Sequence, residues 1–288
     1  MDRLRNSCAI RRAVTVVLCI VFMFVYLCTD CTTFVSCAAT SGKIVYTGTY
    51  DYDKAYAVLD ILNEQREKNG LPRLTMDKEL LKGAMRRAAE TSIYFSHYRP
   101  DGTPFYTVTN KLQRGFSGEN IAAGQNTAAA VMEAWTNSDD HRVNMMNEKY
   151  VSVGIGCYKK DGIVYWAQSF SSQPAKTVVR TGRKKVTLTT RVSADKLQKS
   201  DFQVKTTKNT VKVGKNRHIQ IYLKNEGWPL VKIRIDPASF NWKSGNRKIA
   251  TVSKTGVVTG KKAGKVTIVA KLKTYPYTKL VYTIKVKK

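Results

Sequence analysis

Apolar side chains recur at helical spacing in three segments between residues 50 and 171. These segments are residues 52–69, 75–95 and 126–135, and each one gathers its apolar positions on one face of a helix. The first helix is predicted to end at Asn69 and Gly70, a pair typical of helix C-termini. Thr75 is predicted as the N-cap of the second helix, whose first turn carries acidic side chains that the helix dipole favours.

Two later segments, residues 150–158 and 163–170, alternate apolar and polar positions as β-strands do. The Asp161-Gly162 pair between them is typical of a tight hairpin turn. Cys157 falls on the apolar face of the first strand, so it is predicted to be a small buried hydrophobe rather than a reactive thiol. Residues 50–171 therefore predict a domain of helices packed on a small antiparallel sheet.

The pattern changes after Phe170. Residues 172–204 are polar and basic, and we predict a basic linker or the first strands of a second domain. Residues 205–288 contain short runs rich in valine, threonine, isoleucine and tyrosine, separated by glycine and lysine turns. Strands of that length and spacing predict an all-β sandwich. The fold class of the whole chain is therefore expected to be α+β.

Residues 240–270 carry a recurring frame of a tryptophan, a small polar loop, an "ATVS" hairpin and a glycine before a "TI" strand. The positions of this frame are Trp242, Ala250, Val252, Gly256, Val258, Gly264 and Ile268. The segment resembles the bacterial immunoglobulin-like (Ig-like) group 2 domain, and the resemblance covers most of residues 205–288. It implies core and turn positions, and no chemistry.

The first 39 residues have the layout of a secretory signal peptide. Arginines at positions 3, 5, 11 and 12 precede an apolar run over residues 13–28, and small residues suited to cleavage follow near Ala38 and Ala39. The apolar run of 16 residues is shorter than the roughly 20 that span a bilayer, so removal is favoured over a retained N-terminal membrane anchor. Five of the six cysteines lie in this leader, which leaves Cys157 without a disulfide partner and favours a protein exported to a bacterial surface.

Three motifs in the first domain stand together in order: "FSHYRPDGTPF" around His97, "GENIAAG" around Glu119 and "WTNSDDHRVNMMN" around His141. They resemble the CAP superfamily (cysteine-rich secretory proteins, antigen 5, pathogenesis-related-1) in the disulfide-free form of exported bacterial proteins, over residues 54–171. The resemblance implies an α-β-α sandwich with a surface cleft, in which two histidines and two acidic residues converge and can hold a divalent cation.

The resemblance assigns His97 to the first histidine, Glu119 to the glutamate of the "GEN" motif and His141 to the second histidine. The place of the second glutamate is taken by Ser138. Glu133 is not an obvious substitute, because its position on the third predicted helix turns it toward solvent. Asp139 and Asp140 adjoin His141, and the sequence leaves open whether they approach the cleft.

Two neutral imidazoles and a carboxylate form a reasonable zinc set, so His97, Glu119 and His141 are the predicted ligands of a divalent metal, with Zn²⁺ preferred. The same three residues are the candidate catalytic groups, as a general base and its orienter. The alternative is that Glu119 and Asn120 brace loops by hydrogen bonds while the histidines line a polar groove without metal. His218, the third histidine, is predicted to be an exposed strand residue.

The net charge of +28 is unevenly distributed. Residues 1–171 carry 20 Lys/Arg and 17 Asp/Glu (+3), whereas residues 172–288 carry 29 and 4 (+25). The basic half is predicted to bind an anionic cell-envelope polymer or glycan, against the alternative that its lysines only keep the strands soluble. Nucleic acid is disfavoured because the lysines are dispersed over alternating strands.

These patterns favour an exported, cell-surface or wall-associated binding protein over an enzyme. Its cleft is expected to hold a divalent metal, a small ligand or a peptide, and membrane contact is expected only through an uncleaved leader. The alternative is a metal-assisted hydrolase acting on peptide or cell-wall material, which is disfavoured because the second glutamate and an identifiable nucleophile are missing. A third hypothesis is an adhesive protein that functions through its basic domain alone.

Overall fold

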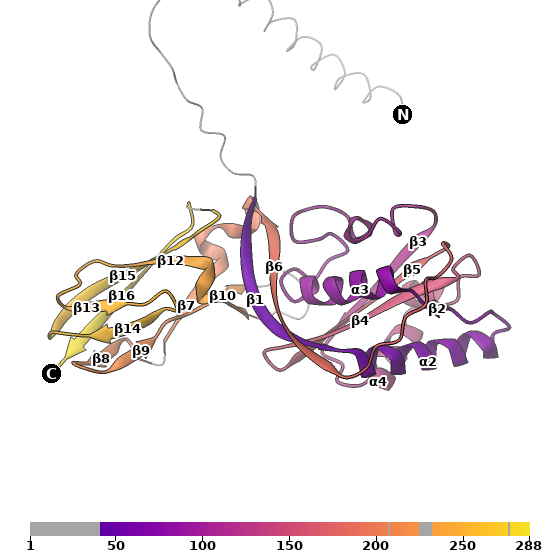
Figure 1. Cartoon of the computed structure of the whole chain (residues 1–288), viewed down its shortest axis with the longest axis horizontal. Helices are drawn as coiled ribbons and strands as arrows, with labels where there is room; N and C mark the ends of the chain where they lie inside the picture. Colours follow the sequence, from indigo (N-terminus) through magenta and orange to yellow (C-terminus); the bar gives the residue numbers. More distant parts are fainter. Residues whose placement is uncertain (1–40, 207, 225–231, 276) are drawn as a thin grey trace, which may run out of the picture. The chain divides into compact units, whose positions relative to one another are not determined.

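The computed structural model of the chain describes residues 41–206, 208–224, 232–275 and 277–288 (Figure 1). These residues belong to one compact unit, Ala39–Lys288. The predicted signal peptide, residues 1–39, lies outside the described residues. Within the described part of the chain, no helix combines the length and the apolar character needed to cross a membrane.

An antiparallel sheet forms the centre of the first domain. Its strands are β1 (Ser41–Asp51), β3 (Ser117–Ala123), β4 (Ser152–Lys160), β5 (Ile163–Ser171) and β6 (Arg183–Ser193), in the order β3-β5-β4-β1-β6. The short strand β2 (Thr75–Met76) pairs with β4 in parallel. The predicted hairpin is confirmed, since Asp161 and Gly162, with φ of 49° and 86°, connect β4 to β5.

Helices cover both faces of this sheet (Figure 1). They are α2 (Tyr52–Lys68), α3 (Lys78–Thr91), α4 (Ala128–Thr136) and α5 (Asp139–Met145). Helix α3 lies directly on β4, because a Cβ at Gly154 or Gly156 would come within 2.1 Å of its backbone. The alternate residues of β4, Val153 and Ile155, share a buried cluster with α2 and α4. The predicted α-β-α sandwich is therefore confirmed.

The second helix begins later than its sequence pattern indicated. Asp77, not Thr75, is the N-cap of α3, and its Oδ1 accepts hydrogen bonds of 2.9 Å from the backbone N–H groups of Glu79 and Leu80. Thr75 instead lies in β2, paired with Ser152. The prediction of Thr75 as the cap was wrong because β2 holds its backbone extended and a carboxylate is the stronger acceptor at a helix N-terminus.

Strands β1 and β6 form a long two-stranded ribbon at the edge of the sheet. They pair along their whole length, from Ser41 opposite Ser193 to Asp51 opposite Arg183. Residues 172–204, expected as a linker or first strands, thus contain the edge strand of the first domain. Lys184 and Lys185 of β6 are exposed, and lysine on an edge strand protects it from pairing with another chain.

The described residues after β6 form strands and short turns, as predicted. Three sheets contain β11-β10-β7, β12-β15-β16-β8 and β13-β14-β9. The bounds are β7 (Phe202–Lys205), β8 (Thr210–Lys212), β9 (Asn216–His218), β10 (Gln220–Lys224), β11 (Lys232–Ile235), β12 (Phe240–Ser244), β13 (Ala250–Val252), β14 (Val257–Gly260), β15 (Gly264–Leu272) and β16 (Lys279–Lys287). Val258, Ile268 and Ile284 belong to a buried cluster that contains residues of this region alone. His218 is exposed on β9, as its sequence context predicted.

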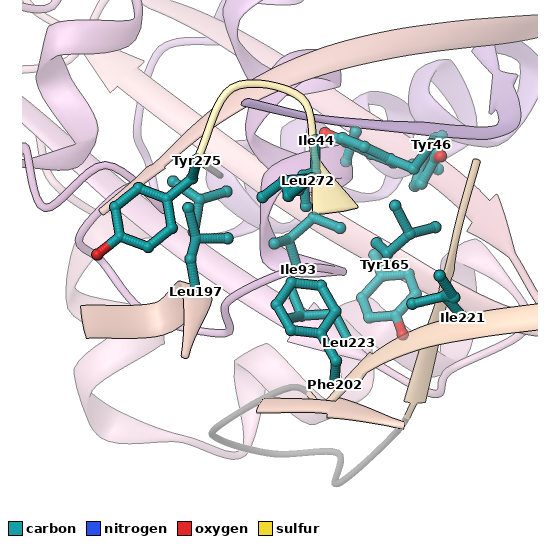
Figure 2. Packing of buried hydrophobic residues seen from close by; sticks show 14 of the residues in the cluster. Ile44, Tyr46, Ile93, Tyr165, Leu197, Phe202, Ile221, Leu223, Leu272 and Tyr275 are labelled. Atoms are coloured by element: carbon teal, nitrogen blue, oxygen red, sulfur yellow. The ribbon is translucent and has the colours of Figure 1, made fainter. Parts of the chain in front are cut away.

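A further buried cluster contains residues of both the first domain and the all-β region. Ile44 and Tyr165, on β1 and β5, belong to the same cluster as Leu223 and Leu272, on β10 and β15 (Figure 2). The backbone of Val45 strengthens this contact. Its N–H donates to Ser239 Oγ at 2.8 Å, and its C=O accepts from the Asp236 N–H at 2.8 Å. The two regions therefore share part of one hydrophobic core.

Truncation of this shared cluster should destabilise both regions together. Leu272 is 0% exposed, so Leu272→Ala is expected to lower the free energy of unfolding by about 2–5 kcal/mol, because a large apolar side chain leaves a cavity. Hydrogen exchange followed by mass spectrometry in increasing urea should show α3 and β15 losing protection at the same concentration. Val281→Ala is the matched control, since Val281 is 49% exposed and should change stability by less than about 0.5 kcal/mol. Loss of protection in β15 while α3 stays protected would show that the regions unfold independently.

Candidate functional site

Glu119 lies on β3 and is held from behind by a buried arginine. Its side chain is 0% exposed, and Arg87 of α3, also 0% exposed, contacts both of its oxygens. Arg87 Nε donates to Oε1 at 2.7 Å, and Arg87 Nη2 donates to Oε2 at 3.1 Å. A guanidinium matches a carboxylate in this two-bond geometry, which makes the pair specific as well as strong.

The same arginine belongs to a larger buried ionic network. Glu90, three residues along α3, accepts from Arg87 at 3.3 Å, from Arg86 at 2.9 Å and from Arg99 at 2.8 and 3.0 Å. Burial alone would raise the pKa of Glu90, but the hydrogen bonds and charges of Arg99, and the charges of Arg87 and Arg86, outweigh it and lower the pKa. Glu90 is therefore ionised at neutral pH, and the network keeps both acids paired.

His97 is positioned by Glu119, whose carboxylate accepts one more hydrogen bond beside those from Arg87. Its Nδ1 lies 3.1 Å from Glu119 Oε2, and its side chain is 56% exposed. Because a carboxylate only accepts hydrogen bonds, Nδ1 carries the proton in this contact. The other ring nitrogen, Nε2, is then an acceptor when the ring is neutral.

His141 lies on α5 and is bonded to the residue that replaces the second glutamate. Its Nδ1 is 2.8 Å from Ser138 Oγ. Ser138 is the N-cap residue of α5, yet its side chain makes no capping bond to the helix. Burial and the charge of His97 lower the pKa of His141, and Asp140 opposes them only partly. The ring is therefore neutral at pH 7.

A buried chain of amide side chains fixes α5 against β3. Asn120 Nδ2 donates to the backbone oxygen of His141 at 3.0 Å and to Gln168 Oε1 at 3.0 Å. Asn144 of α5 donates to Asn120 Oδ1 at 2.9 Å. The position of His141 thus depends on the "GEN" asparagine, and the predicted bracing role of Asn120 is seen directly in these bonds.

The two histidines line one open pocket of about 540 Å³. Its other walls come from Phe95, Ser96, Tyr98, Ile121, Ala122, Ala123, Gln125, Ala134, Trp135 and Ser138. Most of this surface is apolar, and Glu119 is not part of it. The pocket therefore offers two imidazoles and two serines beside mostly apolar surface.

The predicted metal ligands do not form a complete donor set. Among the described residues, no group of three or more His, Cys, Asp or Glu side chains is placed to hold a metal ion. The carboxylate of Glu119 is paired with Arg87, and the hydroxyl group of Ser138 is hydrogen-bonded to His141. As placed here, these residues do not form a ready set of metal ligands, and Zn²⁺ binding stays a prediction.

The other acidic candidates lie away from the cleft. Glu133 is exposed on α4, as predicted. The side chain of Asp139 is 85% exposed and pairs with Arg142 at 2.6 Å, and Asp140 is exposed as well. None of the three lines the pocket.

Arg87 is the functional residue that the sequence interpretation missed. A signal was present, since Arg87 and Glu90 are spaced three apart on a helix whose other facing residues are small or apolar. Charges at such positions are buried only when paired. The sequence alone does not reveal that the partner of Arg87 would be Glu119.

The geometry defines an α-β-α sandwich with a two-histidine cleft, followed by an all-β domain. Residues 59–170 match the CAP family, described as the cysteine-rich secretory protein family, and residues 200–276 match the bacterial Ig-like domain of group 2. The chain carries a CAP domain and a bacterial Ig-like domain, which confirms both resemblances.

Similar proteins include two curated relatives and a solved structure. The uncharacterized protein YkwD of Bacillus subtilis (strain 168) is 36% identical over 117 residues, which are 39% of this chain and 45% of YkwD. The secreted protein RBT4 of Candida albicans is 29% identical over 99 residues, 34% of this chain and 24% of RBT4. The chain thus spans less than half the length of these relatives. A crystal structure of an extracellular protein containing an SCP domain from Bacillus anthracis str. Ames is 27% identical, with a TM-score of 0.39, and the match covers 43% of this chain and 41% of that one.

Removal of Arg87 should destabilise the protein strongly. Arg87→Met leaves the carboxylate of Glu119 buried without its partner, so we expect a loss of about 3–5 kcal/mol in the free energy of unfolding. Urea denaturation followed by circular dichroism measures it. Adding Glu119→Gln should recover part of the loss. Arg73→Met is the control, because Arg73 pairs with Glu67 on the surface and its loss should cost less than about 1 kcal/mol. Equal losses for the two arginines would contradict the central place of Arg87.

Proposed function

We propose that this chain is an exported, cell-surface or wall-associated protein whose CAP cleft binds a small organic ligand or a short peptide without transforming it. The observation that carries this proposal is the Arg87–Glu119 pair. Because that pair removes the carboxylate from the cleft, the cleft is left with hydrogen-bonding imidazoles and apolar surface. Such a lining suits recognition better than it suits metal or acid-base chemistry.

The ligand should combine an apolar body with N–H or O–H donors. The pocket volume of about 540 Å³ lies within the roughly 300–1,000 Å³ of ligand sites. The side chains of Phe95 and Tyr98 provide aromatic contact area. A neutral His97 bonded through Nδ1 presents an acceptor at Nε2. A short peptide, with apolar side chains and backbone N–H groups, meets these requirements.

The alternative of a metal-assisted hydrolase receives less support. Its candidate bases and metal ligands are Glu119, His97 and His141, and both oxygens of Glu119 already accept hydrogen bonds. The bonds to the guanidinium hold this carboxylate away from the pocket, which it does not line. Zn²⁺ binding nevertheless stays a prediction, and the cleft experiment below tests it together with the peptide.

The proposed export is supported by the leader, and the proposed attachment is supported by the basic Ig-like domain. The leader has the layout of a signal peptide, and the relative RBT4 is described as a secreted protein. The excess of 19 positive charges in residues 205–288 (21 − 2) supports binding of the Ig-like domain to an anionic envelope polymer. Lysines that are dispersed over the domain attract an anionic polymer without forming one specific binding site.

Cleft binding can be tested through the three histidines of the chain. Acetylated, amidated tripeptides with apolar side chains should shift the ring carbon-proton NMR signals of His97 and His141, because both rings line the pocket. The exposed His218 should not respond. The variant His97→Ala/His141→Ala should bind at least about tenfold more weakly, since two hydrogen-bonding partners are lost. His218→Ala is the matched control and should bind as the natural chain does.

The same spectra distinguish the metal alternative. We expect Zn²⁺ to bind weakly and equally to the natural chain and to the double variant. Binding at about micromolar affinity or tighter that disappears in the double variant would overturn the organic-ligand proposal and favour the hydrolase. Peptides that move the signals of all three histidines alike would show non-specific association.

Attachment can be tested by sedimentation with purified bacterial cell walls. The variant Lys254→Gln/Lys261→Gln/Lys265→Gln/Lys271→Gln removes four exposed positive charges from the Ig-like domain. It should lose most of the wall-bound fraction, and the natural chain should lose it as salt rises toward 1 M, where the screening length is about 3 Å. Retention that is unaffected by both changes would mean that charge does not hold the protein to the wall.

A further inference from the structure

A second hollow of about 670 Å³ lies in the CAP domain and shares no residue with the histidine cleft. Its walls are α3, the 3₁₀ turn at Phe105–Val108 with the two residues that follow it, and the ribbon of β1 and β6. We call it the α3 groove. Nothing in the cleft chemistry described above uses it.

The α3 groove is lined by positive charge on both walls. Lys78 and Lys82 are four residues apart on α3 and share one helix face, and Arg180 and Lys184 come from the segment that enters β6. All four side chains are exposed, and no ion pair involves them among the described residues. Facing cations repel one another, so an anion placed between them relieves that repulsion and adds its own attraction.

The single acid of the groove does not cancel this charge. Glu79 lines it, but its Oε1 accepts a hydrogen bond of 2.9 Å from the Lys111 backbone N–H. Arg86 also lines it and is already paired with Glu90 at 2.9 Å. The groove therefore keeps a net positive charge, because the four cations outnumber the single carboxylate of Glu79.

The floor of the groove supplies apolar and hydroxylated surface. Tyr50 and Tyr52 stand edge to face, with ring centres 6.3 Å apart, beside the apolar side chains of Leu81 and Met85. Burial raises the pKa of Tyr50 to about 12, so its ring stays uncharged. Asn110 adds an exposed amide. Aromatic rings and aliphatic surface contact the C–H faces of sugar rings, whereas a bare inorganic anion gains nothing from them.

We propose that the α3 groove binds an acidic oligosaccharide, a short chain of sugar or polyol units that bear carboxylate or phosphate groups. The cations of both walls pair with the anionic groups, and the two tyrosines contact the hydroxylated units. This site is separate from the cleft and from the lysines of the Ig-like domain. It therefore does not depend on the function proposed for either.

The test uses isothermal titration of the purified chain with two short acidic probes, an oligogalacturonate and a glycerol-phosphate oligomer, beside a neutral dextran oligomer. Binding of one or both acidic probes at one site per chain is expected, with no binding of dextran. The groove variant Lys78→Gln/Lys82→Gln/Arg180→Gln/Lys184→Gln should bind at least about tenfold more weakly. The Ig-like variant Lys254→Gln/Lys261→Gln/Lys265→Gln/Lys271→Gln loses the same charge and should stay within about twofold of the natural chain.

Each contrary result has a definite meaning. Equal weakening in both four-site variants would overturn the proposal, because it would reduce binding to net charge. Dextran binding as tightly as the acidic probes would overturn the role of the cations. Tighter binding of a single-stranded oligonucleotide that the groove variant abolishes would assign the groove to nucleic acid instead. If the four-site variant fails to fold by circular dichroism, Lys78→Gln/Lys82→Gln carries the same test, with an expected weakening of at least about threefold.

Discussion

The contact on which the cleft depends is the buried pair of Arg87 and Glu119. A carboxylate that is removed from water without a partner is costly, and Glu119 is 0% exposed. Arg87 resolves this cost with two hydrogen bonds, and it also donates to the backbone oxygen of Ser96, next to His97. The pair therefore ties α3, β3 and the loop of the first histidine together. Because it uses the carboxylate for this purpose, it also decides what chemistry is left for the pocket.

The spacing of apolar residues predicted those helices and strands whose buried face can be identified from their own sequence. The helices that became α2, α3 and α4, and the hairpin of β4 and β5, each carry their pattern within a few turns or a few residues. The ribbon of β1 and β6 could not be predicted in this way. Its strands are about 140 residues apart along the chain, as in the pairing of Tyr46 with Leu188, and β6 is an edge strand rich in basic and hydroxylated side chains. Such strands are defined by their partner rather than by their own alternation.

The sequence predicted which residues belong to the site, but it did not predict which residues they contact. The order of motifs identified His97, Glu119 and His141, and the structure places both imidazoles on one pocket and the carboxylate behind it. Whether a carboxylate faces a ligand or a buried arginine depends on the helix packed against its strand. Here Gly154 and Gly156 let α3 approach the sheet closely enough for Arg87 to reach Glu119. That distance is a property of the packed core, and no spacing in the sequence encodes it.

The CAP domain buries several of its acidic groups together with basic partners. The acids that matter to the fold of the CAP domain are buried and paired, as in Asp77 with Lys111 at 2.6 Å and Glu90 with its arginines. A paired and buried carboxylate contributes little field outside the protein. The cations of the α3 groove and the lysines of the Ig-like domain are exposed instead. In water at physiological salt their attraction reaches about 8 Å. Each basic surface therefore acts on the ligand that touches it, and selectivity has to come from the shape and the apolar contacts beside the charges.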